Sequence, residues 1–171
     1  MRVLLISGST RDGSSNTYVL RALHDRDREP VTTDLYEGLR SVPAFVPEGL
    51  APPEVVDVLT RIEAADAVVF STPEYAGSLP GALKNLLDWT VGGGQLYGKP
   101  VAWLDVANPG RGHGARAQLR TVLDYVGARI VEDACVHVTL DRTDGAMSLP
   151  PGEEPTLSRS TEALVAAVAA G

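Results

Sequence analysis

A loop near the start of the chain carries residue types that bind an anion. It runs from Gly8 to Thr17 with the sequence GSTRDGSSNT, and a helical pattern follows it directly. Glycines let such a loop turn tightly, and the hydroxyls of Ser9, Ser14 and Ser15 can donate hydrogen bonds. Arg11 adds a fixed positive charge, and the N-terminus of the helix adds unpaired N–H groups. Together these groups predict a phosphate site.

Other interpretations of this loop compete with a phosphate site. Ser14, Ser15 and Asn16 can also serve as helix caps, although one residue is enough for capping. Two better-known phosphate motifs are absent. No Gly-x-Gly-x-x-Gly follows the first aliphatic run, and Gly98-Lys99 precedes Pro100 instead of Ser or Thr. A hydroxyl-rich loop without these motifs favours a terminal monophosphate, such as that of a mononucleotide cofactor, over a dinucleotide or a triphosphate.

Two later loops could hold the rest of such a ligand. In the segment Ser71 to Trp89, Pro73 and Gly77 shape the backbone, and Tyr75 offers a flat ring. A planar heterocycle could lie beside that segment. A third segment reads Asn108-Pro109-Gly110-Arg111-Gly112-His113-Gly114, and its Pro and Gly residues indicate a loop.

The elements that must position these loops can be read from the hydrophobic pattern. Continuous aliphatic runs predict strands that are buried on both faces, and apolar residues at helical spacing predict helices between them. Long segments rich in Gly and Pro, Tyr36–Pro52 and Asp141–Pro155, are expected to be surface loops. The expected strands are Val3–Ile6, Val31–Leu35, Ala67–Phe70, Val101–Leu104 and Ala134–Leu140, and the expected helices are Thr17–Asp27, Pro53–Ala64, Pro80–Thr90, Ala115–Val126 and Glu162–Ala170.

Strands that alternate with helices imply right-handed βαβ crossovers, and therefore a doubly wound parallel sheet between two helical layers. In such a sheet, ligands bind beyond the carboxyl ends of the strands, where the strand order reverses. The loops after the first, third and fourth strands are the three loops described above. We therefore expect them to form one site.

Composition limits the class of protein. The chain has 171 residues, which predicts a single domain over residues 1–171. Its 15 Lys and Arg against 22 Asp and Glu give a net charge of −7, which argues against nucleic acid as a partner. Cys135 is the single cysteine and cannot form an internal disulfide. No secretory signal or membrane span is visible, so we expect a cytoplasmic protein that does not bind a membrane.

At this point the chain resembles the NADPH-dependent FMN reductase family, whose members have a flavodoxin-like fold and reduce flavins, quinones, azo dyes or metal ions. The resemblance spans most of the chain and implies a three-layer α/β sandwich with a five-stranded parallel sheet in the order 2-1-3-4-5. Two matched segments carry it. They are Gly8-Ser9-x-Arg11-x-x-Ser14-x-Asn16 and Thr72-Pro73-Glu74-Tyr75-x-Gly77-Ser78-x-Pro80-Gly81-x-Leu83-Lys84-Asn85-x-x-Asp88-Trp89.

The resemblance also assigns residues to an FMN site. It places the FMN phosphate on Ser9, Arg11, Ser14 and Asn16, next to the Ser15 hydroxyl. It gives the wall beside the isoalloxazine to Pro73, Glu74, Tyr75 and Gly77, and it places the pyrimidine edge near Asn108 and the N–H groups around Gly110. Ala76 stands where family members commonly have Asn, so its backbone can still contact the ring while one side-chain hydrogen bond is lost.

The function that the resemblance implies is that of an enzyme. FMN would accept hydride from NADPH or NADH and pass electrons to a small acceptor such as a flavin or a quinone. No side chain is assigned a catalytic role, because the ring carries out the redox step. A homodimer or homotetramer is also implied, with Trp89 and the segment 92–94 as contact points. Two alternatives stay open: an FMN-binding electron carrier that does not oxidise NAD(P)H, and a family member that has lost flavin binding.

Several other polar side chains are expected to be structural. Lys84 and Asp88 are four residues apart and predict a solvated ion pair on a helix. Trp89 and Trp103 are expected to be core or interface anchors, and Cys135 a buried apolar residue. His113 is expected either at a helix terminus or in contact with the flavin or nicotinamide. No cluster of residues in the sequence predicts a metal site. The other two histidines, His24 and His137, have no ligand partners nearby in the chain.

Overall fold

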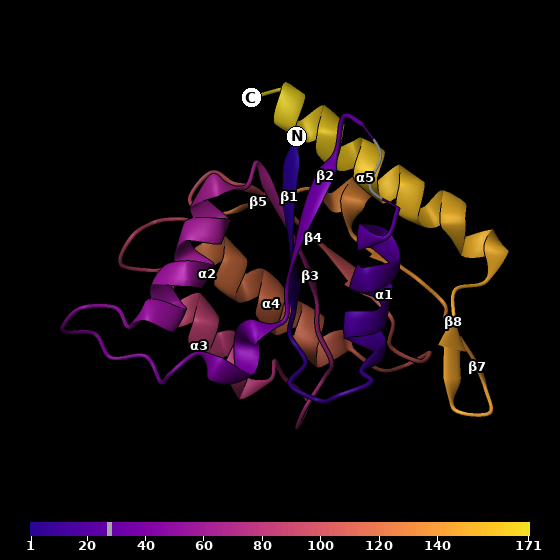
Figure 1. Cartoon of the computed structure of the whole chain (residues 1–171), viewed down its shortest axis with the longest axis horizontal. Coiled ribbons are helices and arrows are strands. Elements are labelled where there is room, and N and C mark those ends of the chain that lie inside the picture. Colours follow the sequence, from indigo (N-terminus) through magenta and orange to yellow (C-terminus); the bar gives the residue numbers. More distant parts are fainter. Residues whose placement is uncertain (27–28) are drawn as a thin grey trace.

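A parallel sheet forms the middle layer of the protein, and helices cover both of its faces (Figure 1). The structure is a computed structural model that describes residues 1–26 and 29–171. The strand order β2-β1-β3-β4-β5 confirms the flavodoxin-like, doubly wound α/β class. The elements are β1 (Arg2–Ser7), α1 (Ser15–His24), β2 (Thr32–Tyr36), η1 (Gly38–Ser41), α2 (Pro53–Ala64), β3 (Ala67–Ser71), α3 (Gly81–Trp89), β4 (Pro100–Asp105), α4 (His113–Tyr125), β5 (Arg129–Ile130), η2 (Glu132–Ala134), β6 (Val136–His137), β7 (Asp141–Thr143), β8 (Ala146–Ser148), η3 (Pro151–Glu153) and α5 (Glu154–Ala169).

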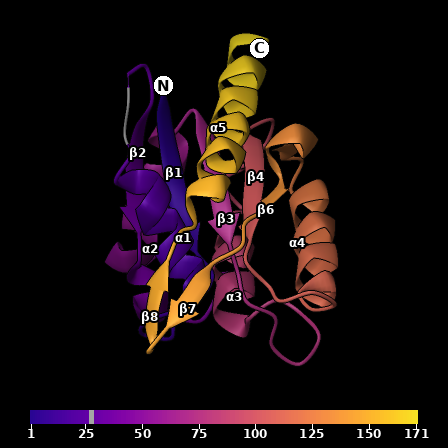
Figure 2. The same cartoon turned by 90° about the vertical axis from the view of Figure 1, so that its right-hand side faces the viewer.

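The alternation of side chains along β1 divides the core into two layers. Leu4 and Ile6 pack with the apolar residues of α2, α3 and α4. Val3 and Leu5 point to the other face and pack with those of α1 and α5. Figure 1 shows the same division, and in Figure 2 helices α1 and α5 lie in front of the sheet. A central strand that is buried on both faces requires apolar residues at successive positions, which is why β1 appears in the sequence as an unbroken aliphatic run.

The predicted surface loop Tyr36–Pro52 is anchored to α3. It contains the short 3₁₀ helix η1, and its Pro43 carbonyl accepts hydrogen bonds from Asn85 Nδ2 at 2.9 Å and Trp89 Nε1 at 3.0 Å. The rings of Phe45 and Trp89 meet edge to face, with centroids 5.0 Å apart. These contacts confirm Trp89 as an anchor, and they hold a long connection against the helix that follows the second candidate loop.

The predicted fifth strand, Ala134–Leu140, is wrong in its extent. Two short strands, β5 and β6, pair with different parts of β4, and the 3₁₀ helix η2 lies between them. Polar contacts hold the segment between β5 and β6 away from the sheet. Both carboxylate oxygens of Glu132 accept from the Arg120 guanidinium, at 2.5 and 2.8 Å. On the opposite side, the Ser160 hydroxyl donates to the Ala134 carbonyl at 2.7 Å.

The predicted loop Asp141–Pro155 is also more structured than expected. It contains the antiparallel hairpin β7–β8 and the 3₁₀ helix η3. Helix α5 begins at Glu154, eight residues before the predicted start at Glu162, because Pro155 fits its first turn and Leu157 already faces the core. The apolar-rich end of this helix is obvious in the sequence, whereas its more polar first half is not.

The other predicted helices match to within two residues at the ends that can be compared. The prediction Thr17–Asp27 corresponds to α1, which begins at Ser15; the predicted end at Asp27 lies outside the described residues. Pro53 begins α2 as predicted, and Pro80 lies immediately before α3. The expected Lys84–Asp88 ion pair is present at 2.6 Å. Among the described residues, none of the helices combines the length and apolarity that a bilayer crossing requires.

The half-buried Cys135 gives stability a specific pH dependence. Burial raises the pKa of its thiol from 9.0 to about 11, and the thiol donates to the Val131 carbonyl at 3.4 Å. Between these values the unfolded chain releases the thiol proton while the folded protein keeps it, so stability falls as pH rises through this window. Between pH 8 and pH 10.5, the free energy of unfolding measured with urea should fall further for the natural protein than for Cys135→Ala. Equal losses would contradict the prediction, since every other titrating group is shared.

Candidate functional site

The loops after β1, β3 and β4 meet at the carboxyl edge of the sheet, as predicted (Figure 1). Strand register places Ser7 beside Ser71, and the Gly8 N–H donates to the Ser71 carbonyl at 2.8 Å. A Cβ on Gly8 would lie 2.5 Å from Thr72 Oγ1 and 2.8 Å from Leu83 Cδ2. The absence of a side chain at Gly8 therefore allows the first and second loops to be in direct contact.

The first loop is shaped by its own hydroxyls. Ser9 Oγ accepts from the Arg11 N–H at 3.2 Å, and Ser14 Oγ accepts from the Asn16 N–H at 3.2 Å. The second contact makes Ser14 the N-cap of α1. Ser9 and Ser14 are both buried, so the side chains that the resemblance assigned to a phosphate also fix the loop.

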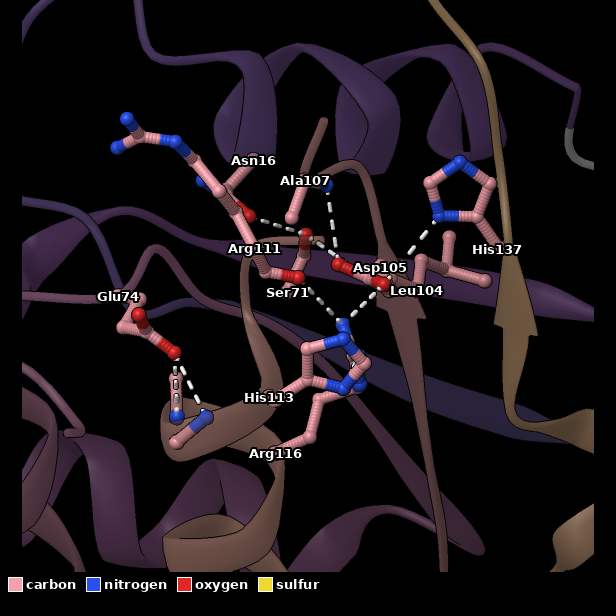
Figure 3. A network of polar contacts seen from close by, with 12 residues as sticks. Asn16, Ser71, Glu74, Leu104, Asp105, Ala107, Arg111, His113, Arg116 and His137 are labelled. Atoms are coloured by element: carbon pink, nitrogen blue, oxygen red, sulfur yellow. Dashed lines mark hydrogen bonds and ion pairs between the residues drawn. The ribbon is translucent and has the colours of Figure 1, made fainter. Parts of the chain in front are cut away.

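Asn16 connects helix α1 to the ends of β3 and β4. Its Oδ1 lies 3.0 Å from Ser71 Oγ, and that hydroxyl also lies 2.7 Å from the Leu104 carbonyl oxygen (Figure 3). These contacts join α1, β3 and β4 in a buried network. Asn16 was assigned to the phosphate by resemblance; its contacts in the structure show that it positions the loop relative to the neighbouring strands.

Three arginines surround the first loop. Arg11 is exposed, and within residues 1–26 and 29–171 no carboxylate pairs with it. Arg40 of η1 donates to the Thr10 carbonyl and to Asp12 Oδ1, the latter at 3.3 Å. Arg142 of β7 donates to the Ser15 hydroxyl. Sequence reasoning missed Arg40 and Arg142, because nothing in the local pattern shows that distant elements return to this loop.

The second loop makes a tight turn at its tip. The Tyr75 and Ser78 backbones exchange two hydrogen bonds of 3.0 Å, which leaves Ala76 and Gly77 as the central residues. Their φ angles are 50° and 74°, so both are left-handed, as in a type I′ turn. Tyr75 is 45% exposed at this tip. The predicted wall residues are thus presented on a short, defined hairpin turn.

Ala76 is strained by this turn. An alanine in the left-handed region costs about 1–2 kcal/mol, whereas asparagine tolerates it better. We expect Ala76→Asn to raise the free energy of unfolding by about 1 kcal/mol and Ala76→Val to lower it, because a β-branched side chain fits this conformation least. Chemical denaturation of the two variants beside the natural protein is the measurement. A destabilised Ala76→Asn would contradict the assignment of strain.

Glu74 joins the second loop to the third. Its Oε2 accepts from the N–H groups of Gly114 at 2.7 Å and Ala115 at 3.2 Å (Figure 3). Gly112, the N-cap of α4, has no side chain that could accept these bonds. A carboxylate at a helix N-terminus is also favoured by the helix dipole. The Glu74 side chain therefore caps α4 from another loop, a role that the sequence did not predict.

The third loop is held by Asp105 at the end of β4. Its Oδ1 accepts from the Ala107 N–H at 3.0 Å, and its Oδ2 contacts Arg116 and, at 3.2 Å, His137 Nδ1 (Figure 3). His113 is the first residue of α4, which confirms its expected helix-terminal place, and its Nδ1 lies 2.9 Å from Arg116 Nη2. The sequence analysis missed Asp105, which ends an apolar strand and gives no other signal.

The predicted tip of the third loop is an exposed turn. The Arg111 N–H donates to the Asn108 carbonyl at 3.0 Å, and Gly110 has a φ of 79°. Pro109 followed by a left-handed glycine is the pattern of a type II turn. Asn108 and Gly110 are both exposed. The structure thus brings all three predicted loops to one edge, where they can hold a phosphate beside a flat ring. No cluster of His, Cys, Asp and Glu in the described part of the chain could hold a metal ion.

Comparisons with known proteins agree with this arrangement. The sequence profile of the NADPH-dependent FMN reductase family matches residues 1–142. An NAD(P)H-dependent FMN reductase of Pseudomonas aeruginosa is 37% identical over 74% of this chain and 71% of its own length. A quinone reductase of Escherichia coli K12 is 33% identical over 77% of this chain and 73% of its own. An NADH:(hydroxy)cinnamate reductase subunit of Vibrio ruber is 33% identical over 72% of this chain, and the match spans 63% of that subunit.

A solved structure supports the same grouping over nearly the full length. The flavoenzyme NAD(P)H:(acceptor) oxidoreductase FerB of Paracoccus denitrificans superposes with a TM-score of 0.74 at 26% identity, covering 98% of this chain and 95% of FerB. This superposition agrees with the flavodoxin-like fold of the chain. The chain therefore belongs to the NADPH-dependent FMN reductase family.

Proposed function

We propose that this protein is an FMN-dependent oxidoreductase that takes hydride from NADPH or NADH and passes electrons to a small acceptor, either a flavin or a quinone. Family membership supports the reaction class, and the names of the relatives support both nicotinamides and both acceptors. The observation that carries the proposal is the junction of three loops at the carboxyl edge of the sheet, each tied to the next by hydrogen bonds.

The first loop fits the FMN phosphate in charge as well as in shape. Helix α1 has no acidic residue in its first turn, and its N-terminus attracts anions. The loop carries the hydroxyls of Ser9, Ser14 and Ser15, and the Arg11 guanidinium lacks a carboxylate partner in the described chain. Asp12, the acidic residue of the loop, is paired with Arg40. A dianion would therefore supply the charge that this site lacks.

The second and third loops fit a flat ring. A Cβ placed on Gly77 or on Gly110 would have no other atom within 4 Å, so the surface beside both turns is open. Pro73, Glu74, Tyr75, Ala76 and Gly77 would present backbone to one side of the ring. Asn108 and the N–H groups near Gly110 would meet its pyrimidine edge, where they can stabilise negative charge.

FMN, when bound, supplies the two-electron chemistry of the reaction. The residues of the chain bind it, orient it and leave one side accessible to the nicotinamide and the acceptor. Glu74 and Asp105 act as positioning residues, because each fixes a loop that would contact the ring. We assign no side chain as proton donor or acceptor, because the transfer of hydride from the nicotinamide to the flavin ring needs neither.

The test is an absorption spectrum of the purified protein followed by anaerobic titration with NADPH and with NADH. We expect a yellow protein whose flavin absorbance bleaches on addition of at least one nicotinamide. A protein that binds FMN but stays oxidised with both would be an electron carrier that needs a separate reductase. A colourless protein that takes up no added FMN would contradict the proposal altogether.

We further propose that residues 1–171 form one domain, that the protein acts in the cytoplasm, and that it assembles as a homodimer or homotetramer. Both core layers pack on a single sheet, which supports one domain. A single cysteine removes any need for an oxidising compartment.

Exposed apolar residues near Trp89, including Phe45, Val46 and Val91, support assembly through this side of the protein. Light scattering gives the mass in solution, and a monomer at micromolar concentration would refute the assembly.

A further inference from the structure

The hairpin β7–β8 is a short, defined arm. Its register pairs Thr143 with Ala146, which leaves Asp144 and Gly145 as a two-residue turn. Their φ angles are 50° and 83°, and an Asp-Gly pair is favoured in exactly such type I′ turns because both residues tolerate the left-handed region. The turn fixes the register, and the register fixes the side of the hairpin on which each side chain lies.

One side of this hairpin faces the body of the protein. Arg142 pairs directly with Met147, and residues opposite each other in an antiparallel pair share a face. Met147 is partly buried, while the rest of the hairpin is exposed. On that same face, the Arg142 guanidinium donates to the Ser15 hydroxyl, across 127 residues of sequence. Figures 1 and 2 show the hairpin toward the end of the molecule where the strands terminate.

The position of Arg142 is electrostatically unfavourable without an anion. Ser15 is the first residue of α1, so the guanidinium lies at the positive end of the helix dipole. Arg142 pairs with no carboxylate within residues 1–26 and 29–171, and neither does Arg11 on the adjoining loop. No acidic residue occupies the first turn of α1. The Arg142 guanidinium, which has no carboxylate partner in the described part of the chain, therefore lies at a helix N-terminus that follows the loop carrying Arg11.

We propose that Arg142 is a phosphate-binding residue, supplied by the hairpin to the FMN phosphate that the first loop holds. The inference rests on the proposed function. The guanidinium would turn from the Ser15 hydroxyl to phosphate oxygens, which its planar fork matches in geometry and charge. The family profile ends at residue 142, so the turn and the second strand that place this arginine lie beyond the matched region. Arg142 would make the site selective for phosphorylated flavin.

The test compares FMN with riboflavin, which has the same ring but no phosphate. Flavin-free protein is titrated into each flavin, and the dissociation constant is measured from quenching of flavin fluorescence. We expect Arg142→Ala to weaken FMN binding at least about tenfold, the usual loss for a hydrogen bond to a charged group, and to leave riboflavin binding unchanged. The FMN affinity of Arg142→Lys should lie between those of the natural protein and Arg142→Ala, because lysine keeps the charge but lacks the planar fork. Arg159→Ala is the matched control, since it removes an exposed arginine of α5 whose contact in the structure is Thr156 at 3.5 Å.

The outcomes separate this inference from the proposed function. If Arg142→Ala binds FMN as tightly as Arg159→Ala does, Arg142 does not bind phosphate, although the function stands. An equal loss for FMN and riboflavin would also overturn the inference, because it would indicate a purely structural role. Natural protein that binds neither flavin would refute the proposed function and this inference with it. Thermal melting of the flavin-free variants shows whether the fold is intact.

Discussion

Gly114→Ala is expected to break the junction between the second and third loops and to abolish flavin binding. A Cβ at this position would lie 1.9 Å from the Gly77 carbonyl oxygen. Neither atom can rotate away, because one belongs to a backbone carbonyl and the other is fixed to helix α4. Overpacking usually costs about 1–3 kcal/mol, and a clash with backbone belongs at or above the top of that range. We expect a loss of at least about 3 kcal/mol of stability.

Thermal unfolding and the flavin content after purification measure this effect. For a chain of this size, a loss of that magnitude lowers Tm by roughly 6–12 °C. Gly81→Ala is the matched control, since Gly81 begins α3 and a Cβ there would have no atom within 4 Å. That variant should be as stable as the natural protein or slightly more so. Equal behaviour of the two variants would show that the two loops do not pack as described.

The double substitution Arg11→Ala with Ser14→Ala is expected to yield protein free of flavin. It removes the Arg11 guanidinium, which has no carboxylate partner among the described residues, and the hydroxyl that caps α1. Losing one charged and one neutral hydrogen bond to a phosphate should weaken FMN binding about 100-fold or more. Loss of the cap should also cost about 1 kcal/mol of stability. Flavin content by absorbance, measured beside the unfolding free energy, is the readout.

Ser14→Asp separates these two effects. Aspartate is a good N-cap and suits the helix dipole, so the variant should keep its stability. Its carboxylate would repel the phosphate, so flavin should still be lost. Flavin content equal to that of the natural protein in both variants would refute the assignment of the first loop. Loss in the double variant alone would assign the effect to the Arg11 charge or to the helix cap, and would exclude an essential contact between the Ser14 hydroxyl and the phosphate.

The alternation of strands and helices and the place of the site were predictable because local patterns carry them, whereas the strand order came from the family resemblance. The runs that became β1, β3 and β4 are buried on both faces, so each appears as an unbroken stretch of apolar residues. Their loops then had to meet at one edge. The fifth strand was predicted less well, because Glu132 and Ser160 act on it from outside the pattern.

The contacts that complete the site were not predictable, since they join residues far apart in the chain. Glu74 caps a helix that begins about 40 residues later, and Arg142 reaches a hydroxyl 127 residues away. Both residues are charged and lie in a loop or a short strand, where a side chain is usually expected to be solvated. Only the folded arrangement shows that each has a partner. The resemblance identified the loops but not the side chains that brace them.

The interruption between β5 and β6 has a consequence for how copies of this protein can meet. A continuous outer strand offers a row of free N–H and C=O groups to which another chain can add by β-pairing, and that is a common route to fibrils. Here the border consists of two strands of two residues each, separated by a 3₁₀ turn. Arg120 lies over the Trp103 ring at that gap, with 5.2 Å to its centroid. This border of the sheet is therefore protected against edge-to-edge aggregation.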